Sequence, residues 1–197
     1  MPRRNSQRGF EPLLLLCDLD GCANVLQPSP VLGYVQAELD GYALQGNPIV
    51  LAGLDMVVRD YNLMPVWASA WGTRAPDAGR LLGVGAEWFA LDFDYPDQDG
   101  PGGASLTDGL NGVAEYKFPF VEAFVGDEPL IWCDDDLTPR LEGWGDVRDA
   151  KIPTLLIRPN PRIGITILHL EQMLHFIERV ARWREELGPG STTPTAA

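Results

Sequence analysis

One stretch near the start of the chain, residues 13–21, constrains the fold more than any other. Four leucines and a cysteine run directly into Asp18-Leu19-Asp20-Gly21. A short, unbroken apolar run is typical of a strand that is buried on both faces, as in a parallel sheet. Because strand side chains alternate, Asp18 and Asp20 point to the same side, at the carboxyl end where open α/β sheets bind ligands. The alternative is a plain acidic turn after a core strand.

The rest of the chain alternates short apolar runs with helical patterns. Strands are predicted at 12–18, 64–68, 88–91, 129–133 and 154–157. Helices are predicted at 48–61, 74–82, 119–124 and 168–187, and 138–148 is helical or irregular. Such alternation predicts an α/β fold, with a doubly wound, Rossmann-like parallel sheet of about five strands in three layers.

A small β-hairpin is predicted directly after the first strand. Asp40-Gly41 separates the β-prone runs 34–39 and 42–45, and Asp-Gly in this setting is a strong hairpin signal. Asn47 and Pro48 then start a helix, as N-cap and first helical residue. The hairpin is expected either to be a surface feature or to stand beside the aspartates as a flap that forms one wall of the site. No large cap domain is expected.

At 197 residues the chain is expected to form one domain. Residues 1–10 are predicted to be a flexible basic arm, 11–188 the single domain and 189–197 a disordered tail. The Gly- and Asp-rich stretch 92–112 is a long loop for a compact domain, which favours either function or mobility.

The chain is strongly acidic, with 15 Lys and Arg residues against 28 Asp and Glu residues and a formal net charge of −13. This charge disfavours a groove for duplex nucleic acid, but it allows a small anionic substrate whose charge is met by a metal and a lysine. No apolar run reaches the roughly 18 residues that span a membrane, so no membrane partner is expected. Cys17, Cys22 and Cys133 form no spaced framework, which favours a reduced, cytoplasmic protein.

Polar residues follow three of the predicted strands, and one lysine lies between the last two groups. They are Asp18, Asp20, Ser69, Lys117, Asp134 and Asp135. Because the carboxyl ends of parallel strands meet at one edge, these groups should converge. One carboxylate can attack phosphorus, and a second can protonate the leaving oxygen. A divalent cation on oxygen ligands, a lysine and a serine hydroxyl would offset the charge of a phosphoryl group.

This ordered set resembles the motifs of the haloacid dehalogenase superfamily, whose members are mostly phosphatases. The resemblance covers residues 12–170. It is closest to the small cap-less members that also occur in nucleic-acid-repair fusions, through Asp-Leu-Asp-Gly at 18–21, Trp-Ala-Ser-Ala-Trp at 67–71 and Trp-Cys-Asp-Asp at 132–135. It implies a Mg²⁺-dependent phosphomonoesterase that forms a phospho-aspartate at Asp18 and uses Asp20 as general acid and base. Cys22 departs from the pattern, since a threonine or valine is common there.

The resemblance also implies a role for each residue of the set. The catalytic residues would be Asp18, Asp20, Ser69 and Lys117. The metal ligands would be Asp18, the backbone carbonyl of Asp20, and Asp134 with Asp135 in support. The substrate-binding residues would be Gly21, Asn24 and Ala70. Whether Asp134 or Asp135 binds the metal directly stays open, with Asp134 preferred. The partner would be a phosphorylated small molecule or a terminal phosphate, and the oligomeric state is not predicted.

Other interpretations remain beside this one. The chain could be a non-catalytic interaction protein on the same scaffold, or a phosphatase for the 3′ or 5′ ends of nucleic acids. A metal-dependent glycosyltransferase is disfavoured, because the chain is short for a nucleotide-sugar domain and Lys117 would have no role. Ser69 could merely cap the next helix, and Lys117 could be a solvated lysine. His169 and His175 have no nearby metal-ligand partner in sequence and are expected to be structural or surface residues.

Residues beside the acids are expected to pack rather than react. Cys17 and Cys133 each precede a strand-end aspartate, so they should be close together on neighbouring strands. They are expected to be free thiols, since buried cysteine behaves as a small hydrophobic residue. Trp67, Trp71 and Trp132 are expected to form core or site walls rather than a platform for stacking bases.

Overall fold

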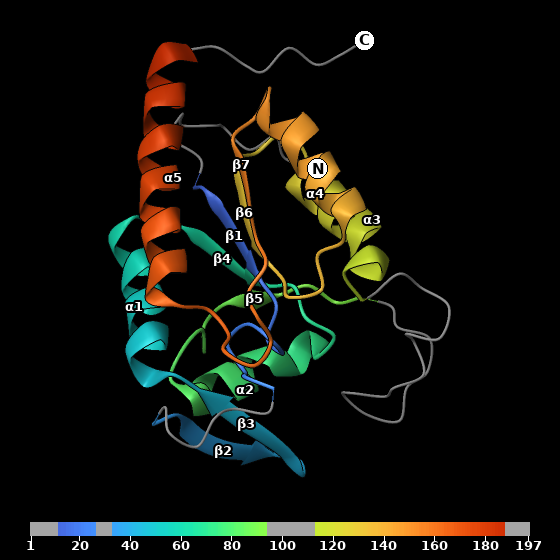
Figure 1. Ribbon diagram of the computed structural model, residues 1–197, viewed down its shortest axis with the longest axis vertical. Coiled ribbons are helices and arrows are strands. Elements are labelled where there is room, and N and C mark those ends of the chain that lie inside the picture. Colours follow the sequence, from blue (N-terminus) through green and yellow to red (C-terminus); the bar gives the residue numbers. More distant parts are fainter. Residues whose placement is uncertain (1–11, 27–32, 94–112, 188–197) are drawn as a thin grey trace, which may run out of the picture.

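The computed structural model describes residues 12–26, 33–93 and 113–187, and a five-stranded sheet lies at its centre. The strands are β1 (Leu14–Cys17), β4 (Met64–Trp67), β5 (Phe89–Ala90), β6 (Leu130–Cys133) and β7 (Thr154–Ile157). They lie in the order β5-β4-β1-β6-β7, and every pairing is parallel (Figure 1). The parallel α/β sheet predicted from the sequence is therefore confirmed, with β1 in the middle.

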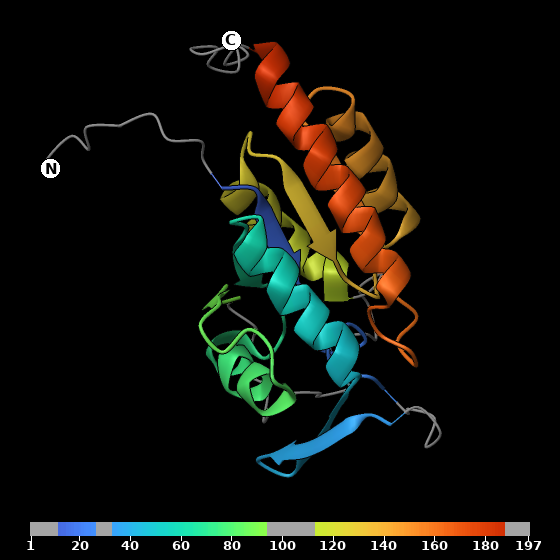
Figure 2. The same ribbon diagram turned by 90° about the vertical axis from the view of Figure 1, so that its left-hand side faces the viewer.

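Helices cover both faces of this sheet, which gives the three expected layers. They are α1 (Pro48–Asp60), α2 (Ala75–Leu82), α3 (Val113–Val125), α4 (Pro139–Asp149) and α5 (Ile167–Leu187). α1 and α5 lie on one face, and α3 and α4 lie on the other (Figures 1 and 2). Each face has its own apolar core, and α2 contributes to the core that contains α1 and α5.

The unbroken apolar sequence of β1 follows from its place between these cores. Leu15 and Cys17 belong to the core under α1 and α5, whereas Leu14 and Leu16 belong to the core under α3 and α4. None of the four is more than 5% exposed. A strand with two buried faces needs apolar residues at every position. The unbroken leucine run is therefore the sequence pattern that the three-layer arrangement requires.

The predicted hairpin is present as β2 (Val35–Leu39) and β3 (Tyr42–Gly46). Its turn residues Asp40 and Gly41 have φ angles of 51° and 84°, which is the left-handed backbone that a two-residue hairpin turn requires. The hairpin stands beyond the carboxyl edge of the sheet, next to α2 (Figures 1 and 2). No cap domain occurs in residues 12–26, 33–93 and 113–187.

Helix α1 begins where its sequence predicts. The Asn47 side chain accepts hydrogen bonds from the backbone N–H groups of Ile49 and Val50, and Pro48 is the first helical residue. The N-cap oxygen satisfies donors that the first turn would otherwise leave unpaired. The hairpin therefore passes directly into a helix that carries the chain back across the sheet.

The prediction for the third helix was wrong in its bounds. The sequence placed a short helix at 119–124, whereas α3 begins at Val113 and contains both Lys117 and Pro119. Proline inside a helix removes one hydrogen bond and usually marks the first turn. Here burial of one face outweighs that cost, because Ala114, Lys117 and Val121 all face the sheet side. The segment 138–148, for which the sequence allows a helix or irregular structure, forms the helix α4.

Several sequence predictions fall outside the described residues. These are the arm at 1–10, the tail at 189–197 and nearly all of the loop at 92–112. The division of the chain into arm, domain and tail therefore stays a prediction. Among the helices that are described, none combines the length and the apolar character needed to cross a bilayer.

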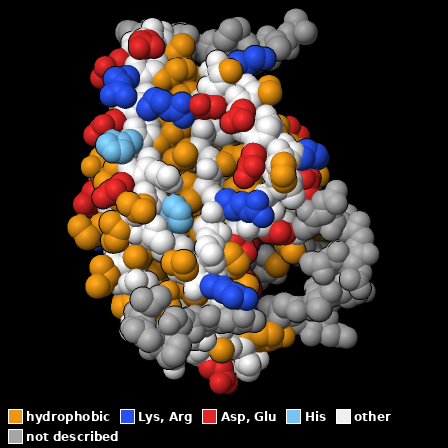
Figure 3. Space-filling view, viewed as in Figure 1, with side chains coloured by type: hydrophobic (Ala, Val, Ile, Leu, Met, Phe, Trp, Pro, Cys, Tyr) orange, Lys and Arg blue, Asp and Glu red, His pale blue; other side chains and the backbone are white. Residues whose placement is uncertain are grey.

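Some hydrophobic side chains remain outside both cores. In Figure 3 they gather at the left edge of the molecule, over α1 and the first turns of α5. The most exposed large apolar residues of these two helices are Ile49, Met56, Ile167 and Leu168. α1 and α5 pack against each other, so this edge of the helical layer is less polar than the rest of the surface in this view.

The far half of α5 is anchored by an ion pair with α4. The Arg179 guanidinium donates to both Asp149 oxygens at 2.7 Å each, and the Thr154 backbone N–H donates to Asp149 Oδ1 at 2.6 Å. Burial alone would raise the pKa of Asp149, but the bonds from Arg179 and Thr154 outweigh burial and lower the pKa. One carboxylate therefore ties α5 to the start of β7.

Replacement of Asp149 by Asn should lower the free energy of unfolding at neutral pH by about 1 kcal/mol, because an amide accepts these bonds less strongly than a carboxylate. Folding lowers the pKa of Asp149, so its contribution is complete above the unfolded-state pKa of about 3.9. The contribution is lost as the pH falls through the lower folded-state value. Urea unfolding of both proteins should therefore show a difference at pH 7 that shrinks in acid.

The matched control is Asp77→Asn. Asp77 pairs with Arg80 on α2, and both side chains are more than half exposed, so this change should alter the unfolding free energy by less than about 0.5 kcal/mol. Equal losses in the two variants, or a difference for Asp149→Asn that grows in acid, would contradict the proposed anchor.

Candidate active site

The carboxyl edge of the sheet carries a compact group of acids. Asp18 follows β1, and Asp134 and Asp135 follow β6. β1 and β6 are neighbours, with Cys17 opposite Cys133, so both acidic turns leave the sheet at the same level. One oxygen from each of Asp18, Asp134 and Asp135 lies within 4.8 Å of the other two. The convergence expected from parallel strands is observed for these three residues.

Lys117 reaches this group from α3. Its Nζ donates to Asp18 Oδ2 and to Asp134 Oδ2, at 2.7 Å in each case. The lysine is 0% exposed. Burial would lower its pKa, but the Asp134 and Asp18 carboxylates outweigh burial and hold the pKa well above its usual range. Lys117 is therefore a charged bridge between β1 and β6, and not a solvated side chain.

The three consecutive aspartates after β6 have three different partners. Asp134 binds Lys117 through Oδ2, and its Oδ1 accepts the Asp136 backbone N–H at 3.0 Å. Asp136 accepts the backbone N–H of Val113, the first residue of α3. Asp135 is left half-buried beside Gly21. The same acidic turn thus fixes the start of α3 and the position of its lysine.

Negative charge exceeds positive charge in this cluster. Burial, with Asp18 and Asp134 in addition, raises the pKa of Asp135 to about 7. Burial also raises the pKa of Asp134, against the opposing effect of Lys117. Carboxylate oxygens are the ligands that hard divalent cations prefer. Asp18, Asp134 and Asp135 therefore form a set of ligand oxygens that could hold a divalent metal ion.

Gly21 allows Asp135 to approach the end of β1. Its φ is +72°, and a Cβ added to it would lie 2.1 Å from the Asp135 Cγ atom. Such a contact is far shorter than any that real carbon atoms tolerate. The glycine in Asp-Leu-Asp-Gly is thus needed here for both its backbone conformation and its missing side chain. Its predicted role in substrate binding stays a prediction.

Asp20 lies beside the cluster and is held by two donors. Asn24 Nδ2 donates to Asp20 Oδ1 at 2.6 Å, and Trp71 Nε1 donates to Asp20 Oδ2 at 2.9 Å. Burial raises the pKa of Asp20, whereas the bonds from Trp71 and Asn24 oppose this rise. The sequence interpretation treated Trp71 as a wall and missed this bond. The Asn24 amide is engaged by Asp20 and by the Gln45 backbone N–H, and its expected contact with substrate stays a prediction.

Ser69 and Ala70 follow β4, the other neighbour of β1. The last residue of β4, Trp67, is opposite Cys17, so Ser69 emerges at the same edge as Asp18. Ser69 is buried, and its hydroxyl accepts the Trp71 backbone N–H at 3.4 Å, whereas Ala70 is exposed. The predicted roles of Ser69 in catalysis and of Ala70 in substrate binding stay predictions.

The hairpin stands on the site side of the sheet, as predicted for a flap. Tyr42 packs edge-on against Trp71, with ring centroids 5.7 Å apart, and Asp40 forms an ion pair with Arg74. Leu44, however, is 0% exposed and belongs to the core. The hairpin is therefore also part of the core, and its removal would delete a buried core residue.

Cys17 and Cys133 are register partners on neighbouring strands, as predicted, and both are free thiols. Cys22 is also free and buried. The pKa of the Cys17 thiol is raised, first by its hydrogen bond with Cys133, and that of Cys22 is raised by burial. Reactivity needs the thiolate, so these cysteines act as packing beneath the acids.

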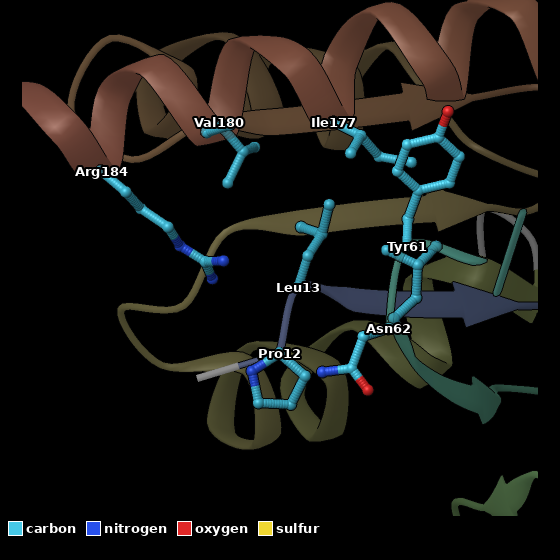
Figure 4. Close-up of a pocket in the computed structure, with 9 residues that line it drawn as sticks. Pro12, Leu13, Tyr61, Asn62, Ile177, Val180 and Arg184 are labelled. Atoms are coloured by element: carbon cyan, nitrogen blue, oxygen red, sulfur yellow. The ribbon is translucent and has the colours of Figure 1, made fainter. Parts of the chain in front are cut away.

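A separate hollow lies at the opposite end of the sheet. It has a volume of about 220 Å³ and is lined by the residues just before β1, the turn after α1 and one face of α5. Pro12 and Leu13 line it on one side, and Ile177, Val180 and Arg184 line it from the helix (Figure 4). Because it is at the amino end of β1, this hollow is distinct from the acidic cluster.

Replacement of Gly21 by Ala should displace the Asp135 carboxylate and weaken metal binding. The left-handed backbone costs a non-glycine residue about 1–2 kcal/mol, and the added methyl group needs the space that Asp135 fills. The measurement is the rise in melting temperature on adding Mg²⁺ or Mn²⁺, which should be smaller for the variant than for the wild type.

Gly41→Ala is the control, since Gly41 has a φ of +84° and no neighbouring atom within 4 Å of an added Cβ. It should lose similar stability and keep the full metal-induced rise. A normal rise in Gly21→Ala would show that Asp135 does not contribute to metal binding.

Replacement of Lys117 by Met should lower the free energy of unfolding by about 3–5 kcal/mol in the presence of chelator, because it leaves two buried carboxylates without their cation. Adding Asp134→Asn should restore part of that loss, since one of the unpaired charges is then removed. Lys151→Met, at an exposed position, should have an effect below about 0.5 kcal/mol. If Lys117→Met and Lys151→Met lowered the free energy of unfolding in urea equally, the role of Lys117 as a buried charged bridge would be refuted.

The sequence was compared with protein-family models and with curated proteins. No protein-family model matches the chain, and no curated protein matches it in sequence.

Proposed function

We propose that the protein is a metal-dependent phosphomonoesterase of the haloacid dehalogenase type, acting through a phospho-aspartate at Asp18. The observation that carries this proposal is the bridge from Lys117 to Asp18 and Asp134, at 2.7 Å to each. These residues come from three segments far apart in sequence, in the order that the motif pattern requires. A surface cluster of acids would not need a fully buried lysine at its centre.

The proposed reaction has two steps. In the first, a carboxylate oxygen of Asp18 bonds to phosphorus, the bond from phosphorus to the leaving oxygen breaks, and Asp20 gives its proton to that oxygen. In the second, water attacks phosphorus, Asp20 takes a proton from the water, and phosphate leaves as the bond to Asp18 breaks. Asp18 and Asp20 are restored.

The other residues of the site assist by position and charge. Lys117 fixes the Asp18 carboxylate and adds a positive charge next to the phosphoryl group. Ser69 would donate a hydrogen bond to a phosphoryl oxygen. A divalent cation held by Asp18, Asp134 or Asp135, and the Asp20 carbonyl would neutralise phosphoryl charge when bound, and Mg²⁺ suits a set of oxygen ligands.

Asp20 favours phosphoryl transfer over dehalogenation. A halide leaves without needing a proton, whereas an alkoxide leaving group is strongly basic and needs one. Asp20 is held by two hydrogen bonds beside the proposed nucleophile, which is where a proton donor to the leaving oxygen is needed. A screen of phosphorylated metabolites and end-phosphorylated oligonucleotides would identify the substrate among the phosphate monoesters.

The test is hydrolysis of phosphate monoesters by the full chain. The wild type should be active with Mg²⁺ and inactive with chelator while still folded. Asp18→Asn should lose at least about a hundredfold in rate, because an amide cannot attack phosphorus, and should unfold as a cooperative unit like the wild type.

Asp60→Asn is the matched control, since Asp60 is exposed at the end of α1 and pairs with Arg59. It should keep full activity. Retention of more than a few per cent of activity in Asp18→Asn, full activity in chelator, or a strict need for zinc would each overturn the proposed mechanism.

A further inference from the structure

Both oxygens of Asp20 are bound by side chains from different parts of the chain. Asn24, from the turn after β1, donates to Oδ1 at 2.6 Å. Trp71, from the turn after β4, donates to Oδ2 at 2.9 Å. A carboxylate held at both ends has one preferred orientation. Asp20 therefore does not rotate freely toward or away from the cluster around Asp18.

The two donors are in turn held by the hairpin. Asn24 Oδ1 accepts the Gln45 backbone N–H at 2.7 Å. Trp71 is 5% exposed; its ring packs in a T-shaped arrangement with that of Tyr42, and the guanidinium of Arg74 lies over it at 5.6 Å from the ring centre. Arg74 also pairs with Asp40 at the hairpin tip. Two separate paths thus run from the hairpin to the carboxylate of Asp20.

We propose that Trp71 is a positioning residue for the acid step, and that the β2–β3 hairpin sets the orientation of Asp20 through Trp71. This inference rests on the proposed function, because it assumes that Asp20 gives a proton to the leaving oxygen. The Trp71 ring stays covered by Tyr42 and Arg74, so Trp71 acts through its N–H on Asp20 and not by stacking on substrate.

A misplaced general acid has an effect that depends on the leaving group. An alkoxide is strongly basic and departs only with a proton, whereas a nitrophenolate departs without one. The rate constant kcat/KM reports the steps up to departure of this group. Loss of the Trp71 N–H should therefore lower kcat/KM for glycerol 2-phosphate and leave kcat/KM for 4-nitrophenyl phosphate nearly unchanged.

The main variant is Trp71→Phe, which removes the N–H and keeps an aromatic ring. We expect kcat/KM to fall by about tenfold or more for glycerol 2-phosphate and by less than about twofold for 4-nitrophenyl phosphate. Tyr42→Ala, which removes the ring packed on Trp71, should show the same selectivity with a smaller loss. Asp20→Asn should show it most strongly.

Trp67→Phe is the matched control. It removes an indole N–H that bonds the Gly85 carbonyl at 2.9 Å in the core, so it should lower stability without changing the ratio between the two substrates. Equal loss on both substrates in Trp71→Phe, or no loss on either, would overturn the proposal.

A second measurement does not depend on activity. The indole N–H resonance of Trp71, identified by its absence from the spectrum of Trp71→Phe, should shift in Asp20→Asn and in Tyr42→Ala, while that of Trp67 stays in place. An unmoved Trp71 resonance in Asp20→Asn would refute the hydrogen bond and with it the proposal. If that resonance moves but the wild type hydrolyses no phosphate ester, the proposed function fails and the hydrogen bond to Asp20 stands.

Discussion

The buried bridge from Lys117 to Asp18 and Asp134 is the interaction on which the site depends. A buried lysine loses its hydration, and only close carboxylates offset that loss. The bridge therefore requires β1 and β6 to end at the same level, and it requires α3 to lie against this edge of the sheet. The register of Cys17 with Cys133 meets the first requirement. The cap that Asp136 gives to Val113 meets the second.

The turn after β1 is fixed from both sides of the site. The Leu26 N–H donates to the carbonyl of Pro161, and the Ile165 N–H donates to the carbonyl of Cys22. Gly164 allows this approach, because an added Cβ would lie 2.4 Å from the Cys22 oxygen. On the other side, Asn24 and the hairpin hold Asp20. Asp18 and Asp20, the proposed nucleophile and acid, thus lie at a turn that is tied to rigid elements, as precise positioning requires.

The sequence predicted the elements whose signals are local. The leucine run defined β1, Asp40-Gly41 defined the hairpin, and Asn47-Pro48 defined the start of α1, because burial, turn geometry and capping are each properties of a few adjacent residues. The helix that carries Lys117 could not be predicted from such local signals. This helix contains Pro119, whose local preference indicates a helix start, and only the packing of α3 against the sheet outweighs that preference. The Trp71 bond to Asp20 joins residues 51 positions apart, so no spacing rule reveals it.

The charge balance of the site explains why three adjacent aspartates are not redundant. Lys117 offers one positive charge, which Asp18 and Asp134 share. Asp136 is directed to the start of α3, where the helix dipole favours a carboxylate. Among the described residues no cation pairs with the Asp135 carboxylate, whereas Arg158 donates to its backbone carbonyl at 3.2 Å. Burial, with Asp18 and Asp134 in addition, raises the pKa of Asp135 to about 7. One oxygen from each of Asp18, Asp134 and Asp135 lies within 4.8 Å of the other two. A divalent cation at this point would supply two positive charges and offset the imbalance, whereas a second lysine would supply only one. Burial and the neighbouring carboxylates together raise the pKa of Asp135, and the same excess of negative charge favours a divalent cation at this point.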